Sequence, residues 1–94
     1  MSPSSESTIV LSADLHARPA GLLARTAAGF RSTVTVTSGG RAVDARSVLL
    51  VMSLGATKDT EVTVRAEGDD AEMAVDALVA ILSQVGDAST LATS

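Results

Sequence analysis

The sequence predicts one small α+β domain, in which a four-stranded antiparallel sheet carries three helices on one face. Three observations predict it: a length of 94 residues, an apolar content of 46%, and a pattern that alternates between strand and helix periodicity. The length allows one domain, and the apolar content is enough for one packed core. Each predicted strand has a single apolar face, so a two-layer sandwich in the order β-α-β-β-α-β-α is expected, with water on the other side of the sheet.

The first half of the chain predicts a strand, a helix and a hairpin. The β-branched run at residues 8–11 indicates a strand, and apolar residues at helical spacing over 17–30 indicate an amphipathic helix that ends at Gly29. Alternation over 33–44 is interrupted only by a serine and two glycines, and glycine tolerates positive φ. This last segment is therefore expected to form a hairpin.

The second half predicts a short helix, a strand and a final helix. Ser47 is expected to cap a helix over 48–54 that ends at Gly55, with a strand over the same run as the alternative. Residues 61–66 alternate as a strand does. The buried stripe expected on the last helix is apolar throughout and consists of Ala71, Ala74, Val75, Leu78, Ile81 and Leu82.

The ends of the last helix and of the domain are also predicted. Asp69 and Glu72 have the spacing of a capping box at the start of the last helix, and Gly86 is expected to end it. The whole chain is interpreted as one domain with a core over about 8–86. The expected flexible ends are residues 1–6 and 87–94.

Composition excludes several classes of function. A net charge of −4 and a single aromatic residue, Phe30, argue against binding to nucleic acid. The absence of cysteine and the presence of one histidine exclude disulfides, thiol catalysis and a multi-histidine metal centre, and neither a metal nor a cofactor is expected. The polar N-terminus lacks the pattern of a signal peptide, and no apolar run approaches the roughly 20 residues of a membrane span. A cytoplasmic monomer without membrane insertion is expected.

Charge is distributed unevenly along the chain. Residues 1–58 hold six cations and three acids, whereas residues 59–94 hold one cation and eight acids. The first part therefore suits an acidic partner. The acids of the second part are interpreted as a solvated face, because runs of charge usually mark exposed surface.

The candidate site is the segment Leu15-His16-Ala17-Arg18-Pro19, at the predicted junction between strand and helix. A helix start has backbone N–H groups without intrahelical acceptors and a partial positive charge, and proline within the first turn sacrifices no needed N–H. A phosphoryl group on the imidazole could accept hydrogen bonds from the N–H groups of Ala17 and Arg18, and the Arg18 guanidinium adds a cation. Neutral imidazole is a good nucleophile near pH 7. The alternative is an exposed histidine that only caps the helix.

The segment resembles the active-site signature of HPr, the histidine-containing phosphocarrier family of the bacterial phosphoenolpyruvate:sugar phosphotransferase system. The resemblance extends over about residues 8–86 and includes Gly29-Phe30, Val34-Thr35-Val36, Ala45-Arg46-Ser47 and Val51-Met52-Ser53-Leu54-Gly55. It implies an open-faced β-sandwich, phosphorylation of His16 at Nδ1, and transfer from enzyme I to enzyme IIA domains. It also implies a carrier rather than an enzyme with its own small-molecule substrate.

The resemblance further implies a docking surface for both partners. Val51 and Leu54 are spaced to face the sheet, and Leu50 is left open between core and contact surface. The residues predicted to contact partners lie on the first and second helices or just before the second, and are Arg25, Arg46, Val48, Leu49 and Met52. Some HPr proteins are phosphorylated by a regulatory kinase at the position of Ser47, although a helix cap explains this serine sufficiently.

The sequence departs from the family pattern at two positions near these sites. Asp14 stands where glycine is common, two residues before His16, and Leu50 stands where glycine or a polar residue is frequent. Two other functions are alternatives. One is a non-catalytic regulatory domain that binds an anion at the same helix start. The other is hydrolysis by paired carboxylates such as Asp69 and Asp70, which is weaker because adjacent acids at a helix start are usually caps.

Overall fold

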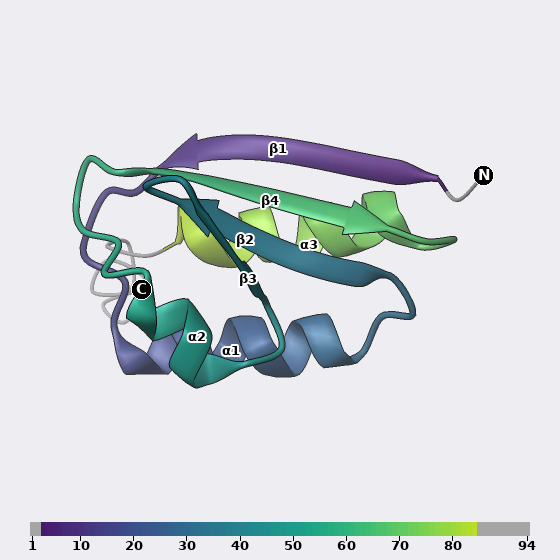
Figure 1. The fold of residues 1–94 in the computed structure, drawn as a ribbon, viewed down its shortest axis with the longest axis horizontal. Coiled ribbons are helices and arrows are strands. Elements are labelled where there is room, and N and C mark those ends of the chain that lie inside the picture. Colours follow the sequence, from purple (N-terminus) through teal and green to yellow (C-terminus); the bar gives the residue numbers. More distant parts are fainter. Residues whose placement is uncertain (1–2, 85–94) are drawn as a thin grey trace, which may run out of the picture.

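The computed structural model describes residues 3–84 and arranges them as a sheet with its helices on one side (Figure 1). In chain order the elements are β1 (Ser4–Val10), α1 (Ala17–Ala28), β2 (Thr33–Ser38), β3 (Arg41–Asp44), α2 (Val48–Ser53), β4 (Glu61–Glu67) and α3 (Ala71–Ser83). The predicted element order and fold class are therefore confirmed.

The sheet is antiparallel throughout, and its strands lie in the order β1-β4-β2-β3. Val64 of β4 lies opposite Val36 of β2, and Val36 in turn lies opposite Val43 of β3. On the other side of β4, Val62 lies opposite Ile9 of β1. Apolar residues thus share one face of the sheet, as the alternation in the sequence predicted.

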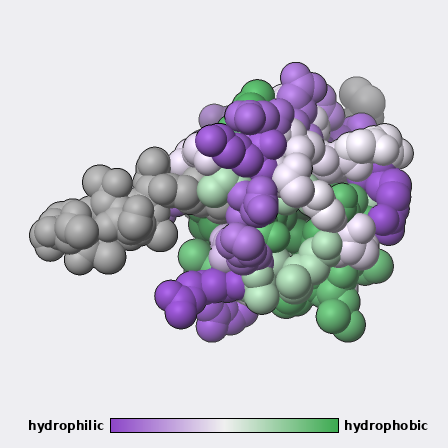
Figure 2. Space-filling view, turned by 90° about the vertical axis from the view of Figure 1, so that its left-hand side faces the viewer, coloured by the Kyte–Doolittle hydropathy of each residue, from purple (hydrophilic) through white to green (hydrophobic). Residues whose placement is uncertain are grey.

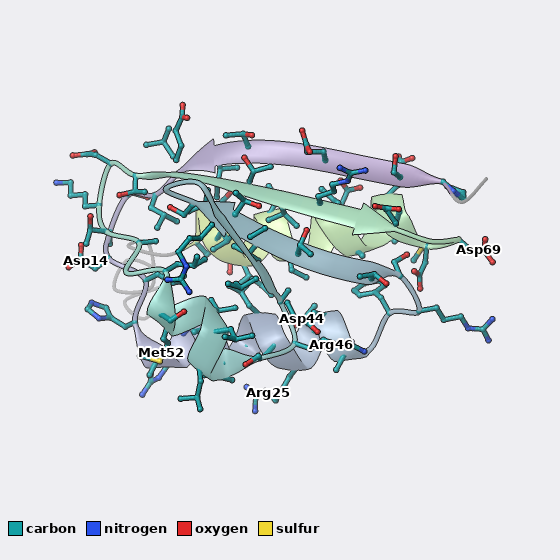
Figure 3. The ribbon with its side chains drawn as sticks, viewed as in Figure 1. Asp14, Arg25, Asp44, Arg46, Met52 and Asp69 are labelled. Carbon is teal, nitrogen blue, oxygen red and sulfur yellow. The ribbon has the colours of Figure 1, made fainter. Side chains whose placement is uncertain are left out.

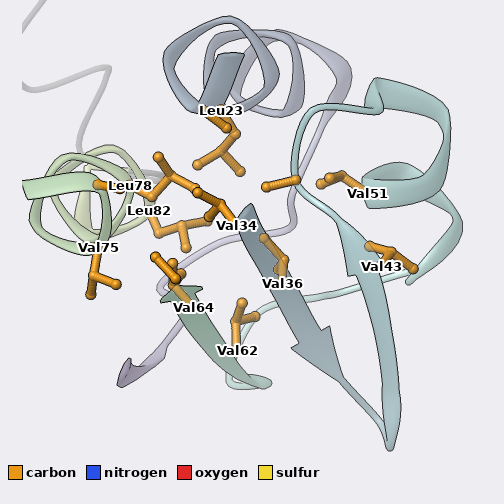
Figure 4. Packing of buried hydrophobic residues seen from close by; sticks show 14 of the residues in the cluster. Leu23, Val34, Val36, Val43, Val51, Val62, Val64, Val75, Leu78 and Leu82 are labelled. Atoms are coloured by element: carbon orange, nitrogen blue, oxygen red, sulfur yellow. The ribbon is translucent and has the colours of Figure 1, made fainter. Parts of the chain in front are cut away.

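The core fills the space between that face and the helices (Figure 4). Val34 and Val36 of β2 and Val62 and Val64 of β4 are completely or almost completely buried. They pack with buried residues from all three helices, namely Leu23 of α1, Val51 of α2, and Val75, Leu78 and Leu82 of α3. Each fully buried valine or leucine contributes about 1.5–3 kcal/mol through removal of apolar surface from water.

The opposite face of the sheet carries polar side chains, and no helix within residues 3–84 covers it (Figure 1). The hydroxyl groups of Thr8 and Thr63 are 2.8 Å apart and share a hydrogen bond between β1 and β4. Arg65 and Glu67 form an exposed ion pair at 3.2 Å, which contributes little to stability because solvent screens it. The sheet is therefore open-faced, as the resemblance implied.

Glycines supply left-handed backbone at two of the predicted turns. Gly39 and Gly40 between β2 and β3 have φ values of 59° and 81°, as a tight hairpin requires. Gly55 has a φ of 62° directly after the C-cap of α2. Both the hairpin and the end of the short helix are confirmed, and the alternative of a strand over 48–54 is wrong.

The first strand is longer at its N-terminus than the sequence predicted. β1 begins at Ser4 rather than at residue 8, so residues 4–6, expected to be flexible, belong to the sheet. β4 provides the reason, because it pairs with β1 from Ser4 opposite Glu67 to Val10 opposite Glu61. Serine has little intrinsic preference for strands, and here tertiary pairing overrides that preference.

The ends of α3 also differ from the prediction. Its N-cap is Asp70 rather than Asp69, and the N-cap makes no side-chain capping hydrogen bond, so the predicted capping box between Asp69 and Glu72 is wrong. The Asp70 carboxylate bonds to another loop instead. The helix ends at Ser83, earlier than expected. Gly86, the predicted end, lies outside the described residues, as do residues 87–94. Ile81, predicted to be buried, is only half-buried.

Candidate functional site

The backbone of His16 forms the N-cap of α1, and its ring makes no capping hydrogen bond. It is the N-cap residue, with extended φ and ψ of −91° and 177°, and its carbonyl accepts a hydrogen bond from Ala20 N at 3.1 Å. Its side chain makes no capping hydrogen bond and is exposed to solvent. The imidazole therefore remains accessible to another molecule.

The first turn of α1 surrounds this ring with groups that favour an anion. Ala17, Arg18 and Pro19 are the first three helical residues, and the N–H groups of Ala17 and Arg18 have no acceptor within the helix. This turn contains no acidic residue, and the Arg18 side chain is exposed. The structure thus brings the three predicted site residues, His16, Ala17 and Arg18, into one helical turn.

The loop before His16 is tied to the loop between α2 and β4. Leu15 N donates to Ala56 O at 3.0 Å, and Leu11 N donates to Thr60 O at 3.0 Å. In addition, the Asp14 carboxylate accepts a hydrogen bond from Lys58 N at 2.9 Å. This side-chain link was not predicted, because residues 14 and 58 are far apart in the sequence and no local pattern relates them.

An exposed apolar surface lies beside this end of the molecule, on α2. Leu49, Leu50 and Met52, which we call the α2 patch, have exposed fractions of 81%, 43% and 41%. Figure 2 shows hydrophobic atoms gathered at the lower right of this end, on the side where α2 lies. The exposure of Leu49 and Met52 agrees with their predicted contact role. Leu50, which the sequence left open, also faces solvent.

The other apolar residues of α2 face inward. Val51 is fully buried, and Leu54 is half-buried against the core, as predicted. Val48, predicted to lie on the contact surface, is also half-buried and packs against the core. It therefore offers a partner less area than expected, because its place at the start of α2 turns it toward the same side as Val51.

Two predicted interface arginines lie near the α2 patch, in different settings (Figure 3). Arg25 is exposed in the last turn of α1. Arg46 lies just before α2, where its backbone N–H and its guanidinium both donate to Asp44, at 2.9 Å and at 3.2–3.3 Å. The guanidinium hydrogen bond, followed by the backbone one, lowers the pKa of Asp44 below its ordinary value. Asp44 was missed at the sequence level, although its two-residue spacing from Arg46 across a turn was a usable signal.

Ser47 is engaged in the structure as a helix cap. Its Oγ accepts a hydrogen bond from Leu50 N at 3.2 Å, and its side chain is half-buried. The predicted capping role is therefore confirmed.

The adjacent acids Asp69 and Asp70 do not form a hydrolytic pair. The Asp70 carboxylate accepts hydrogen bonds from Ser32 Oγ at 2.5 Å, from Ser32 N at 2.9 Å and from Arg31 N at 2.9 Å. The Ser32 hydroxyl, and then the Arg31 N–H, lower the pKa of Asp70. This carboxylate holds a loop, so the structure gives no support to the hydrolase hypothesis. Within residues 3–84, no three metal-ligating side chains converge, and no helix is long and apolar enough to cross a membrane.

An open-faced α+β sandwich with an exposed histidine at a helix start fits the class of small phosphocarrier domains that the sequence resembles. Comparisons with known proteins identify the family within that class. The family model described as "PTS HPr component phosphorylation site" matches residues 3–84. The phosphocarrier protein HPr of Haemophilus influenzae is 40% identical over 74 residues, which are 79% of this chain and 87% of the relative.

Solved structures agree with this match. The crystal structure of HPr-C-His from Thermoanaerobacter tengcongensis is 40% identical, with a TM-score of 0.78 over 85% of this chain and 92% of the other. That of a phosphocarrier protein HPr from Bacillus anthracis is 32% identical, with a TM-score of 0.75 over 87% of this chain and 98% of the other. The chain belongs to the HPr family of phosphocarrier proteins of the phosphotransferase system.

Proposed function

We propose that His16 accepts a phosphoryl group from phosphorylated enzyme I and passes it to enzyme IIA domains of sugar transporters. The observation that carries this proposal is the position of His16, whose backbone caps α1 while its exposed ring makes no capping hydrogen bond. A ring with no structural role can form and lose a covalent bond without disturbing the fold. Membership of the phosphocarrier family supports the assignment over a regulatory domain that binds an anion without covalent chemistry.

The two transfers follow one scheme. The lone pair on Nδ1 of His16 attacks the phosphorus of the donor phosphohistidine, and the P–N bond of the donor breaks as its electron pair returns to the donor ring. The phosphoryl oxygens then accept hydrogen bonds from the first-turn N–H groups of Ala17 and Arg18, and the Arg18 guanidinium adds positive charge. In the second transfer, a nucleophile on the acceptor domain attacks the same phosphorus and the His16 ring is the leaving group.

The partners dock beside this ring. The α2 patch provides an apolar centre, and Arg25 and Arg46 provide cations at its edge. A partner surface with acidic side chains around an apolar centre fits this arrangement in both charge and polarity. Val48 contributes only the small part of its surface that remains exposed.

A second, regulatory hypothesis concerns phosphorylation of Ser47. A phosphate at its Oγ would place negative charge directly beside the α2 patch and would weaken the docking of an acidic partner by repulsion. A regulatory kinase would be required, and its product is phosphoserine at this position. Mass spectrometry of protein from cells grown on several carbon sources tests the hypothesis. The hypothesis is rejected if Ser47 is unmodified under all of them.

The main test uses purified protein with phosphoenolpyruvate and enzyme I. The protein should gain a phosphate that is labile in acid and stable in alkali, and His16→Ala should gain none. Arg18→Ala should keep the thermal stability of the wild type and be phosphorylated roughly tenfold more slowly, because it removes a cation that stabilises the transferring group. A wild-type protein that takes up no phosphate, or a His16→Ala variant that still takes it up, refutes the proposal.

A further inference from the structure

We propose that Asp14 is a positioning residue for His16: its carboxylate, as hydrogen-bond acceptor for the Lys58 N–H, fixes the loop that carries the phosphoacceptor ring. The inference rests on the proposed role of His16 and adds to it a residue that does not touch the reacting atoms. It starts from the 2.9 Å hydrogen bond between Lys58 N and Asp14 Oδ1, which joins the His16 loop to the loop between α2 and β4.

The loop that leads to His16 is anchored at both ends by buried leucines. At its start, Leu11 exchanges two backbone hydrogen bonds with the neighbouring loop, donating to Thr60 O at 3.0 Å and accepting from Asp59 N at 2.8 Å. At its end, Leu15 N donates to Ala56 O at 3.0 Å. Asp14 adds a side-chain link directly before Leu15, and it is itself exposed. The hydrogen bonds of Asp14 and Leu15 therefore hold the backbone directly before His16 against the neighbouring loop.

The position of the His16 ring depends on this backbone because the ring makes no capping hydrogen bond of its own. On one side the backbone is fixed by α1, through the bond from Ala20 N to His16 O. On the other side it is fixed by the bonds of Asp14 and Leu15. In-line phosphoryl transfer requires the attacking nitrogen to be aligned with the donor, and a displacement of about 1 Å in such an arrangement can slow a reaction roughly 100-fold. Loss of the Asp14 link alone allows a smaller displacement and a smaller effect.

The role requires an acceptor oxygen, and the negative charge is not needed for it. An uncharged amide oxygen accepts a backbone N–H in the same geometry as a carboxylate oxygen. A glycine at position 14 would offer no such acceptor, so the link depends on the side chain of this residue. Asp14→Asn keeps an acceptor oxygen but removes the charge, whereas Asp14→Ala removes both. The two variants therefore distinguish the acceptor from the charge.

The experiment compares these two variants with the wild type and with Asp69→Ala. Asp69 lies at the opposite end of the molecule from Asp14, and no hydrogen bond or ion pair joins it to the part of the chain that the structure describes (Figure 3). Its variant therefore controls for the loss of one negative charge. We expect Asp14→Ala to accept phosphate from enzyme I about three- to tenfold more slowly, and Asp14→Asn and Asp69→Ala to stay within about twofold of the wild type.

A second measurement does not depend on phosphoryl transfer. Amide hydrogen exchange at Lys58 should be about tenfold faster in Asp14→Ala and unchanged in Asp14→Asn. The NMR signals of the His16 ring and of the Ala17 amide should shift in Asp14→Ala and return to wild-type positions in Asp14→Asn. If no protein takes up phosphate, the proposed function fails, and the exchange and ring signals still decide whether Asp14 positions His16.

Three results would overturn the inference. Equal phosphorylation rates for the wild type and Asp14→Ala would show that the link does not affect transfer. An Asp14→Asn variant as slow as Asp14→Ala would assign the effect to charge. Unchanged His16 ring and Ala17 signals in Asp14→Ala would show that the hydrogen bond does not position the ring.

Discussion

The two ends of the molecule are both held by an aspartate that reaches across to a distant loop, but to different extents. At the end with the candidate site, Asp14 accepts one backbone N–H, that of Lys58. At the other end, Asp70 accepts the backbone N–H groups of Arg31 and Ser32 and the Ser32 hydroxyl. The second end is also closely packed, because Gly68 lies so near Ser32 that a Cβ at position 68 would be 2.6 Å from Ser32 Oγ.

From this difference we expect the Asp70 end to serve mainly the stability of the fold and the Asp14 end to serve mainly the chemistry of the candidate site. The end with Asp70 joins the start of α3 to the loop before β2, so its contacts serve the fold. The end with Asp14 keeps an exposed histidine and an exposed apolar patch, and under the proposed function a partner approaches both. Functional loops are commonly the less stable parts of a domain. Substitutions at the Asp70 end should therefore change stability first, and those at the Asp14 end should change transfer first.

The largest expected change in the free energy of unfolding is that of Gly68→Ala. Gly68 has a φ of 144°, which side chains disfavour, and its new Cβ would lie 2.8 Å from Ser32 Cα. Backbone strain and overpacking each cost about 1–3 kcal/mol, so the free energy of unfolding in urea should fall by about 3 kcal/mol.

Gly21→Ala is the matched control for that substitution. Gly21 lies inside α1, and a Cβ there would meet nothing within 4 Å. Alanine is the better helix former, so this variant should be about 0.5–1 kcal/mol more stable than the wild type. If Gly68→Ala loses no more than about 1 kcal/mol, close packing at the Asp70 end is not a source of stability.

A smaller effect is expected at the cap of α2, close to the candidate site. Ser47→Ala removes the acceptor of the Leu50 N–H and should lower the free energy of unfolding by about 1 kcal/mol. Ser47→Asn, which keeps a capping oxygen, should remain close to the wild type in the same urea titration. Equal losses for both variants would mean that the hydroxyl has some role other than capping.

The smallest expected effect is a pH dependence of folding stability that arises from Asp70. Because hydrogen bonds from Ser32 and Arg31 lower its pKa in the folded state, the ionised carboxylate favours folding. That contribution is complete above the unfolded pKa, about 4, and is lost as the pH falls through the lower folded pKa. The stability difference between the wild type and Asp70→Asn should therefore narrow as the pH is lowered below about 4. A difference that stays constant over this range contradicts the expectation.

Local patterns were sufficient to predict most of the fold. The spacing of apolar residues gave the helix-strand order, and residue types at turns gave the hairpin glycines and the Ser47 cap, since each depends on residues close together in the sequence. The predictions were wrong where a distant partner decides the outcome. The N-terminal serines of β1 are ordered by pairing with β4, and Asp70 bonds to the loop before β2 rather than to its own helix.

At the candidate site, too, local features could be predicted from the sequence and contacts between distant residues could not. The positions of His16, Ala17 and Arg18 in one helical turn follow from the junction of a loop with a helix and from a proline in the first turn, which the sequence shows directly. The link from Asp14 to Lys58 spans 44 residues and required the folded structure. The inward turn of Val48 likewise depends on how a six-residue helix is seated, which its periodicity alone does not determine.

At the N-cap of α1 this protein has a residue that suits reactivity better than it suits helix stability. Serine or aspartate at that position would stabilise the helix through a side-chain hydrogen bond, a gain of about 1 kcal/mol that histidine does not provide here. The chain gives up that increment at a position where a nucleophile lies next to the open amides of the first helical turn. A thermostability screen that ignores activity would therefore select replacements at His16 and discard the proposed phosphate acceptor.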